Sequence, residues 1–344
     1  MKNKILITSA TGKTGFPAAV QLLKEGYPIK ILARSRNEKI YRLEKLGAEI
    51  VLGDFTNYED MHHALHGVSR VYYCHPFIPN LLTNTKTFIK AAQETHVEAV
   101  VNMGQWLAEF DDQKSIHTLE TKKAYSVFEQ SGLNVVHVIP GFFADNTFFV
   151  LEFAIQLGLL PLPFGAGKNP AISNEDLGLV IASLLKKPFP YIGKKLRPTG
   201  PKSLSAKEMA EIFSKVAGRK VRYINIPQWM FLKAAFAFAK DFGLDAFTIS
   251  QVRHYMNEYQ TNKFNVGGVT DVVHQIAGKV PDDFEAIVER YMKNSKYSKQ
   301  SFSKKISAIG KFLKIPFTHT PSIKDLERFN TKEALFTQTA INTL

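Results

Sequence analysis

The sequence predicts an α/β protein, with a doubly wound parallel sheet and a smaller, mostly helical C-terminal lobe. Short apolar, β-branched runs alternate with helical patterns up to residue 140, and a glycine-bearing turn joins the first run to the first helix. After Pro140 this rhythm changes. We therefore expect a sheet domain over residues 1–140, a lobe interleaved with the sheet over 141–292, and a basic extension over 293–344.

Strands in the first part are predicted from continuous apolar runs, which are typical of strands buried on both faces of a parallel sheet. The six runs are Lys4–Thr8, Ile29–Ala33, Glu49–Leu52, Ser69–Tyr73, Ala99–Asn102 and Val135–Ile139. Five segments between them carry apolar residues at helical spacing. These segments are 17–24, 37–46, 58–65, 81–94 and 119–130.

The second half contains fewer strand signals. Ser173 to Asp176 reads as a capping box before a helix over 177–185, and Ser205 begins another helix that reaches about Val216. A strand follows over 221–226, and further helices begin near Trp229, Thr248 and Asp282.

The composition is that of an ordinary globular protein. Of 344 residues, 45% are hydrophobic and 22% are charged, which excludes disorder and a low-complexity scaffold. Cys74 is the only cysteine, so a disulfide framework and a cysteine-based zinc site are excluded, and we expect no metal. No apolar run is long enough for a signal peptide or a membrane span, which favours a cytoplasmic protein.

Positive charge is concentrated near the C-terminus. The net charge is +13, but seven lysines and no acid lie between Tyr291 and Ile323. Since over half of the net charge lies in one segment, a general nucleic-acid-binding function is disfavoured. No zinc finger, RNA-binding sheet signature or arginine-rich run is present, so we expect no nucleic acid partner.

The first turn is the strongest functional signal. It comprises Ser9, Ala10, Thr11, Gly12, Lys13, Thr14 and Gly15, directly between a strand and a helix. Glycines at this spacing let the backbone approach a pyrophosphate at a helix N-terminus. A P-loop would need a glycine where Ile7 stands, so that motif is excluded. A plain strand-to-helix corner remains the alternative.

Basic residues follow the second predicted strand. Arg34 and Arg36 stand about twenty residues past the turn, where an acid would bind the ribose 2′-hydroxyl of NAD and an arginine accommodates the 2′-phosphate of NADP. We therefore expect NADP(H) rather than NAD(H). Gly53, Asp54 and Phe55 end the third strand at the expected adenine edge, although Asp54 is equally suited to cap a helix.

An ordered set of motifs resembles the NmrA-like branch of the atypical short-chain dehydrogenases/reductases. The set comprises Thr8-x-Ala-Thr-Gly-x-x-Gly15, Arg34, Gly53-Asp54, Ile139-Pro-Gly-Phe-Phe143, Pro170 to Asp176, Thr199-Gly-Pro201 and Ser205. The resemblance covers about Lys4 to Met292. It implies a Rossmann domain with a helical substrate lobe, NAD(P)H binding, and either quinone or carbonyl reduction or cofactor sensing.

The sequence departs from that family at two places. The family usually has glycine where Ser9 stands. Relatives with full reductase chemistry carry Tyr-x-x-x-Lys at the fifth helix, where this chain has His117 near the tyrosine position and Lys122 displaced by one.

His117 is the first candidate for catalysis, as a proton donor with a pKa near neutrality, and Lys122 is a candidate to hold the nicotinamide ribose. The alternative for both is a solvated helix N-terminus. Tyr72 or Tyr73 is another candidate donor, although one of them is expected in the core.

Strand ends on the crevice side are predicted to line the cofactor cleft. They contribute Cys74, His75 and Pro76 after the fourth strand, Asn102 and Gly104 after the fifth, and Pro140 and Phe142 after the sixth. Cys74 is expected to line the cleft rather than act as a nucleophile. The pairs Phe142-Phe143 and Phe148-Phe149 fit an apolar substrate pocket, with core packing explaining half of each pair.

The basic extension contains an amphipathic segment. Phe302, Ile306, Ile309, Phe312 and Leu313 fall on one face of a helix, and Lys304, Lys305 and Lys311 on the other. Such a helix can lie on an anionic membrane through residues 293–316, or dock its apolar face on the protein itself. We favour the second arrangement.

Together these features predict an NADP(H)-dependent oxidoreductase that reduces a small apolar carbonyl or quinone. The alternative is a non-catalytic NADP(H)-sensing regulator that acts through a protein partner, and a homodimer is also open. A sugar-nucleotide epimerase is disfavoured because such chemistry relies on the missing tyrosine.

Overall fold

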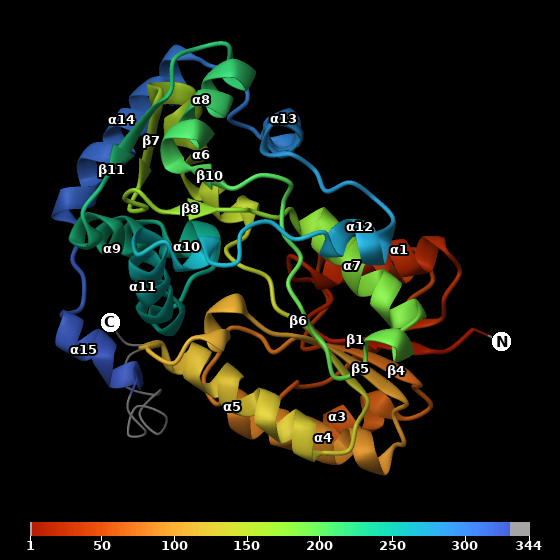
Figure 1. The fold of residues 1–344 in the computed structure, drawn as a ribbon. Coiled ribbons are helices and arrows are strands. Elements are labelled where there is room, and N and C mark those ends of the chain that lie inside the picture. Colours follow the sequence, from red (N-terminus) through yellow and green to blue (C-terminus); the bar gives the residue numbers. More distant parts are fainter. Residues whose placement is uncertain (1, 331–344) are drawn as a thin grey trace.

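The computed structural model describes residues 2–330 and contains a seven-stranded parallel sheet at its centre (Figure 1). The strand order is β3-β2-β1-β4-β5-β6-β9. This is the Rossmann arrangement, whose switch point lies between β1 and β4. The bounds are β1 Ile5–Ile7, β2 Ile29–Ala33, β3 Glu49–Leu52, β4 Arg70–Tyr73, β5 Ala99–Met103, β6 Val135–Val138 and β9 Lys195–Leu196.

All six predicted strands are therefore present, and the sequence missed only the last strand of the sheet. β9 pairs with β6 through His137 and Val138, and it is two residues long. Such a short pairing leaves no run of apolar residues that a pattern could detect.

Helices cover both faces of the sheet (Figure 1). On one face, Leu177, Val180 and Ile181 of α7 pack against Ala18 and Leu22 of α1. On the other face, the ring of Phe88 stacks on that of Tyr73 at 4.1 Å. The first layer comprises α1 Gly15–Lys24, α2 Glu38–Lys45, α7 Asn174–Lys186 and α12 Val272–Ala277, and the second α3 Tyr58–Leu65, α4 Leu81–Glu94 and α5 Ile116–Gln130.

The second lobe has its own aromatic core beyond the carboxyl end of the sheet. Phe148 stacks on Tyr291 at 3.9 Å, and Phe164 stacks on Tyr259 at 3.8 Å. Two small strand pairs support it, β7 with β11 and β8 with β10. The elements are α6 Leu151–Leu157, β7 Leu159–Leu162, β8 Lys168–Asn169, β10 Leu204–Ser205, α8 Ala206–Ala217, β11 Arg222–Asn225, α9 Gln228–Ala237, α10 Ala239–Phe242, α11 Ala246–Gln260, α13 Phe284–Asn294, α14 Phe302–Lys314 and α15 Ile323–Glu327.

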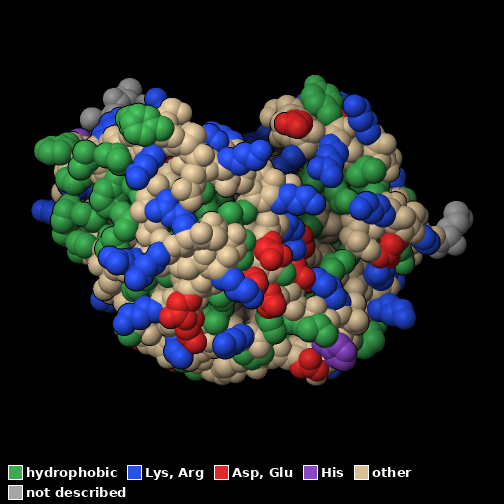
Figure 2. All heavy atoms as spheres, turned by 90° about the horizontal axis from the view of Figure 1, so that it is seen from above, with side chains coloured by type: hydrophobic (Ala, Val, Ile, Leu, Met, Phe, Trp, Pro, Cys, Tyr) green, Lys and Arg blue, Asp and Glu red, His purple; other side chains and the backbone are tan. Residues whose placement is uncertain are grey.

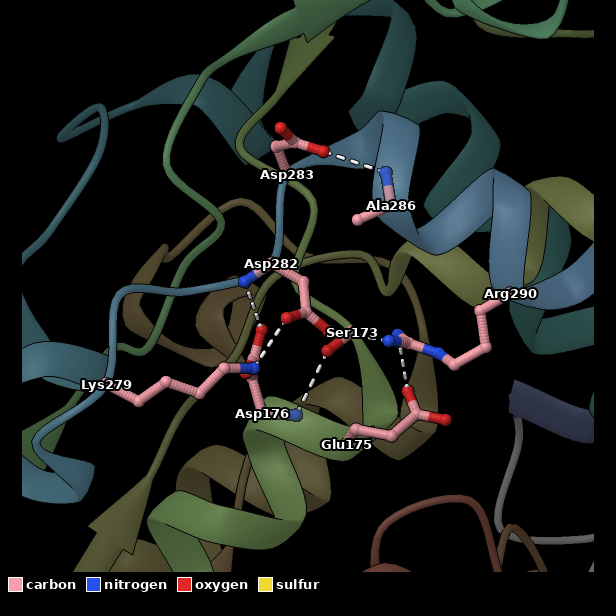
Figure 3. Close-up of polar contacts among 8 residues, drawn as sticks. All are labelled: Ser173, Glu175, Asp176, Lys279, Asp282, Asp283, Ala286 and Arg290. Carbon is pink, nitrogen blue, oxygen red and sulfur yellow. Dashed lines mark hydrogen bonds and ion pairs between the residues drawn. The ribbon is translucent and has the colours of Figure 1, made fainter. Parts of the chain in front are cut away.

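The start of α7 differs from the predicted capping box. The hydroxyl of Ser173 accepts a hydrogen bond from the Asp176 N–H at 3.0 Å, but the Asp176 carboxylate does not return to Ser173 (Figure 3). Instead, this fully buried carboxylate accepts from Lys279 Nζ and from the backbone N–H of Asp282, both at 2.8 Å. The expected reciprocal bond is absent because the carboxylate serves a tertiary contact.

A second layer of ion pairs extends that contact to α13. Arg290 donates to the Asp282 carboxylate at 2.8 Å and to Glu175 at 2.9 Å (Figure 3). The network therefore joins α7, which packs on the sheet domain, to the helix that completes the second lobe.

The position of the C-terminal helix α14 differs from the prediction that its apolar face docks on the protein. Ala308 is fully buried, and Lys311 pairs with Glu152 of α6 at 2.7 Å. Phe302 and Leu313 of the predicted apolar face point to solvent instead. The helix docks through Ala308, Phe312 and Lys311, so of the predicted apolar face Phe312 packs inward on Phe153, while Lys311 finds a charge partner in Glu152.

We expect Asp176→Ala to lower the free energy of unfolding by about 2–4 kcal/mol, because Lys279 and a buried N–H lose their acceptor. Glu175→Ala is the matched control. This substitution removes only a half-exposed partner of Arg290 and should lower the free energy of unfolding by less than about 1 kcal/mol. Urea unfolding of both variants measures the difference. Equal midpoint shifts would contradict the central position of Asp176.

Candidate functional site

The turn between β1 and α1 is held in a geometry that requires small residues. A Cβ on Gly15 would lie 2.5 Å from the carbonyl oxygen of Ser9, so no larger residue fits there without moving the backbone. Ser9 itself has a φ of +49°, in the left-handed region that favours glycine. Its hydroxyl donates to the Cys74 carbonyl at 2.8 Å, which fixes the turn against the end of β4.

This turn leaves backbone donors free at the start of α1. In the part of the chain that the structure describes, the N–H groups of Lys13, Thr14 and Gly15 donate no hydrogen bond. The Thr14 hydroxyl does not cap the helix, because it bonds to the Tyr72 hydroxyl at 2.7 Å. Free N–H groups at a helix N-terminus form an anion-binding site, so the turn fits a pyrophosphate.

Other turn residues hold the loop in place. Ala10 is buried, and the carbonyl of Thr11 accepts from Lys39 at 2.8 Å. Lys13 reaches across the site to the Asn146 side chain at 2.8 Å. A Cβ on Gly12 would lie 3.0 Å from the Ser9 carbonyl oxygen. The predicted turn residues thus form one compact loop at the end of β1, in which Ala10 and Thr14 are buried and Lys13 is exposed.

The two candidate arginines differ in their surroundings. Arg36 makes two bonds to the Glu44 carboxylate, at 2.8 and 2.7 Å. Arg34 is exposed and forms no hydrogen bond or ion pair with any described residue. Only Arg34 is therefore available for a ligand phosphate without breaking an existing pair.

The segment after β3 forms a compact turn. The Asp54 carboxylate accepts from the N–H and the hydroxyl of Thr56, both at 2.7 Å, and these bonds lower the pKa of Asp54. The residue that caps α3 is Asn57, so the alternative role of Asp54 as a helix cap is wrong. Phe55 packs against His75 with ring centroids 5.4 Å apart. A Cβ on Gly53 would lie 2.9 Å from the Asp60 side chain.

A largely apolar cavity of about 520 Å³ opens beside the turn at the carboxyl ends of β4, β5 and β6. Lys13 of the turn lies on its wall, so the cavity borders the start of α1. The second lobe closes the other side with α9, α10 and α11, and with the end of α14. Predicted residues that line it are Cys74, His75, Gly104, His117, Pro140, Phe142, Phe143 and Phe149.

One polar cluster interrupts the apolar wall of the cavity. The Gln105 amide donates to His117 Nδ1 at 3.1 Å and to the Thr121 hydroxyl at 3.0 Å. Thr118 donates to the other end of the same amide at 3.0 Å, which fixes its orientation. The Tyr255 hydroxyl also lies 3.3 Å from His117 Nδ1.

These contacts determine the tautomer of His117. Because Nδ1 accepts from Gln105, the ring proton resides on Nε2. Nε2 is buried and has no partner among the described residues. The Phe77 ring stacks on the imidazole at 4.1 Å and holds its plane. His75 lines the same cavity, and its Nε2 accepts from the Asn84 amide at 3.0 Å, so its Nδ1–H likewise has no partner among the described residues. Two histidines of the cavity wall therefore each carry a ring N–H that a ligand could accept from.

Burial changes the acid–base character that the sequence predicted. Desolvation lowers the pKa of His117 to about 3, and the pKa of the neighbouring His75 to about 4. The expectation of a pKa near neutrality is wrong for His117, because the cavity wall disfavours the charged ring. At neutral pH the ring is a neutral donor and not a charged acid.

A model of the NmrA-like family matches residues 1–298. The chain belongs to the NmrA-like family. It is 29% identical over 236 residues to the NAD(P)H azoreductase of Xenophilus azovorans, covering 64% of this chain and 77% of that one.

Solved structures share the fold of this NmrA-like protein at low identity. The NADPH-dependent quinone oxidoreductase of Escherichia coli, complexed with NADPH, has a TM-score of 0.69 at 18% identity, covering 83% of this chain and 99% of that one. The negative transcriptional regulator NmrA, in complex with NADP, has a TM-score of 0.70 at 14% identity, and the match covers 87% of this chain and 99% of that one.

Some predicted site residues of the NmrA-like protein lie away from the cavity. Lys122 is on the surface of α5, where it pairs with Asp111. The Asn102 side chain bonds to His137 at 2.9 Å within the sheet. Pro76 follows β4 but is not on the cavity wall. These residues were predicted from their positions at strand ends or at a helix start. Their side chains point away from the cavity, which those positions do not reveal.

The tyrosines of β4 are buried, and the cysteine that follows this strand is partly buried. Tyr72 and Tyr73 are both fully buried, with hydroxyls on Thr14 and Thr85, so the candidate proton donors are core residues. Burial raises the pKa of Cys74, which keeps its thiol protonated as expected for a lining residue.

The sequence missed two functional candidates, Gln105 and Tyr255. Gln105 stands two residues after β5, and the rule that ligands bind at strand ends could have found it. Tyr255 comes from α11, 138 residues beyond His117. No local pattern connects residues at that separation.

Asp145 lies near Lys13 but is not part of the cavity wall. Its carboxyl group is buried and bonded to the Asn174 amide, and one of its oxygens has no partner in residues 2–330. Desolvation raises the pKa of Asp145 to about 6 despite the nearby Lys13. The ionised form is therefore a cost to the folded state at neutral pH.

We expect Asp145→Asn to remove this cost. Since the folded-state pKa is raised, the stabilising effect of the protonated carboxyl is complete below about pH 4 and is lost as pH rises through about 6. As the pH rises from about 4 to above 6, the free energy of unfolding of the variant should increase relative to that of wild type by up to about 3 kcal/mol. Unfolding measured at pH 4 and pH 7 tests this, and a difference that does not change with pH would contradict it.

Proposed function

We propose that this NmrA-like protein is an NADP(H)-dependent oxidoreductase that reduces a small apolar carbonyl or quinone. The observation that carries the proposal is a largely apolar cavity beside the glycine turn, lined by His117, whose ring N–H has no partner among the described residues. A carbonyl oxygen is the acceptor that such a donor suits, and the apolar wall suits the rest of an aromatic substrate.

The cofactor assignment rests on the turn and on Arg34. The free N–H groups of Lys13, Thr14 and Gly15 would hold the pyrophosphate. The exposed guanidinium of Arg34 would donate hydrogen bonds to the 2′-phosphate, which the adenosine of NAD lacks. Relatives named for NADPH or NAD(P)H use, among them the azoreductase and the quinone oxidoreductase, support this assignment.

When bound, the dinucleotide supplies the hydride. The residues of the chain then act on the substrate oxygen, which gains negative charge as the hydride arrives. His117 Nε2–H donates a hydrogen bond to that oxygen, while Gln105 and Tyr255 keep the ring in the required tautomer and orientation. A neutral histidine in an apolar site is effective as a donor to an oxyanion. The proton that completes the reduction comes from solvent.

We expect NADPH oxidation with members of a panel of quinones and aldehydes, and we expect His117→Ala to lower kcat/KM by about 10²-fold or more. Lys122→Ala is the matched control, because its side chain pairs with Asp111 outside the cavity, and it should change kcat/KM less than about twofold. Steady-state kinetics of both variants measure this. Equal losses would contradict the role of His117, and wild-type protein that binds NADPH without any turnover would overturn the reductase assignment.

We expect Arg34→Ala to raise the Kd for NADPH by about tenfold or more and to leave the Kd for NADH within about twofold. Arg36→Ala should have little effect on either, because that side chain is held by Glu44. Fluorescence titration of the two variants with both cofactors measures these constants. Equal weakening of NADPH and NADH binding would rule out a 2′-phosphate contact.

A cofactor-sensing regulator is the second candidate function. The observation that favours it is the surface position of Lys122 in place of the lysine that reductase relatives use. The structural likeness to the regulator NmrA with NADP supports the same reading. Binding of NADPH without turnover, together with capture of a protein partner that depends on the cofactor, would establish this function instead.

A further inference from the structure

The helix α14 presents its apolar residues to solvent. Its outer face consists of Phe302, Ile306, Ile309 and Leu313, which repeat at intervals of four, three and four residues. These side chains are 80%, 54%, 41% and 62% exposed. Phe317, just beyond the helix, is 87% exposed. A continuous apolar face of this kind marks an interaction surface.

The opposite side of α14 is fully engaged with the protein. Lys311 pairs with Glu152 at 2.7 Å, and Lys304 donates to the Lys296 carbonyl at 2.6 Å. Ala308 is buried, and the Phe312 ring meets Phe153 at 5.6 Å. The helix is thus anchored by charges that face inward, and it cannot turn its outer face to the core without breaking them.

The helix is also formed before any partner arrives. The Ser301 hydroxyl accepts from the Lys304 N–H at 3.2 Å and caps the N-terminus. An amphipathic helix that is already folded does not lose backbone entropy on binding.

Positive charge surrounds the outer face of α14. Figure 2 shows green hydrophobic side chains gathered at the left edge of the molecule, where Figure 1 places α14, with blue lysines near them. No acid lies between Tyr291 and Ile323. The exposed lysines of this segment are Lys293, Lys296, Lys299, Lys305 and Lys314.

We propose that the outer face of α14 binds the surface of an anionic lipid membrane. Apolar side chains between lysines fit that surface, because the chains enter the acyl boundary while the ammonium groups meet anionic headgroups. A second copy of this chain would bring two lysine-rich faces together and repel. Within residues 2–330 no helix has the length and apolarity to cross a membrane, so the contact is peripheral.

The inner side of the same segment connects this surface to the cavity. Phe312 and Ile315 line the cavity, and they pack there with Met230, Ala234 and Phe238. A membrane-bound α14 would bring the cavity wall close to the acyl region. If the proposed function holds, on which this step rests, the substrate is a lipophilic quinone or carbonyl compound dissolved in the bilayer.

The test is flotation of the full-length protein with vesicles, without cofactor or substrate. We expect binding to phosphatidylcholine vesicles that contain phosphatidylglycerol, weakened by salt, and little binding to phosphatidylcholine alone. The double variant Phe302→Ser/Leu313→Ser should lower the partition coefficient about tenfold or more. Lys305→Gln/Lys314→Gln should lower it to a similar extent, for anionic vesicles only.

The matched control is Leu52→Ser/Val280→Ser, which removes two apolar side chains that are 53% and 70% exposed on other parts of the surface. It should bind vesicles as wild type does. Absence of binding to anionic vesicles at low salt, or equal binding by the Phe302/Leu313 variant, would overturn the proposal. Sedimentation velocity of the same variants decides the alternative occupant. A wild-type dimer that this variant converts to a monomer would overturn it in favour of a second copy.

Turnover separates this proposal from the proposed function. With a long-chain quinone in anionic vesicles, the Phe302/Leu313 variant should lose about tenfold or more in rate, while its rate with a water-soluble quinone stays unchanged. Vesicle binding without turnover of either quinone would overturn the reductase and leave the membrane contact supported. Turnover of the soluble quinone without vesicle binding would support the reductase and overturn the membrane contact.

Discussion

The close approach of helix α1 to the carbonyl of Ser9 is the constraint on which the rest of the site depends. Only a glycine at position 15 allows this approach, and the left-handed Ser9 closes the turn that makes it. The Ser9 hydroxyl then bonds to β4, so the turn, the N-terminus of α1 and the switch point of the sheet form one rigid unit. Free N–H groups on one side and the cavity on the other are both consequences of that unit.

Burial in the cavity wall keeps the imidazole of His117 neutral at neutral pH. In water a histidine would change charge near neutral pH, but in this apolar wall the charged ring loses its hydration and gains no acid partner. Gln105 and Tyr255 then decide which nitrogen carries the proton. A site built in this way suits chemistry in which negative charge develops on a substrate oxygen.

The C-terminal segment reverses the usual arrangement of an amphipathic helix. Lys304 and Lys311 of α14 face the protein, where a backbone carbonyl and Glu152 receive them, whereas Phe302, Ile306, Ile309 and Leu313 are left outside. The same helix also closes the cavity, so its two sides serve the protein interior and the proposed membrane surface. Through Phe312 and Ile315, this helix connects an outer surface of the protein to the cavity of the candidate site.

The sequence by itself determined the sheet, the turn and the cofactor class it suits, because buried parallel strands and glycine turns leave local signals that tertiary packing does not change. It could not determine the direction of single side chains. Lys122 and Asn102 were expected at the site and lie elsewhere, whereas Tyr255 joins His117 from 138 residues away. The orientation of α14 was likewise decided by Glu152 on another helix. Partners such as these are separated in the chain and meet only in the folded protein, so no pattern of spacing could reveal them.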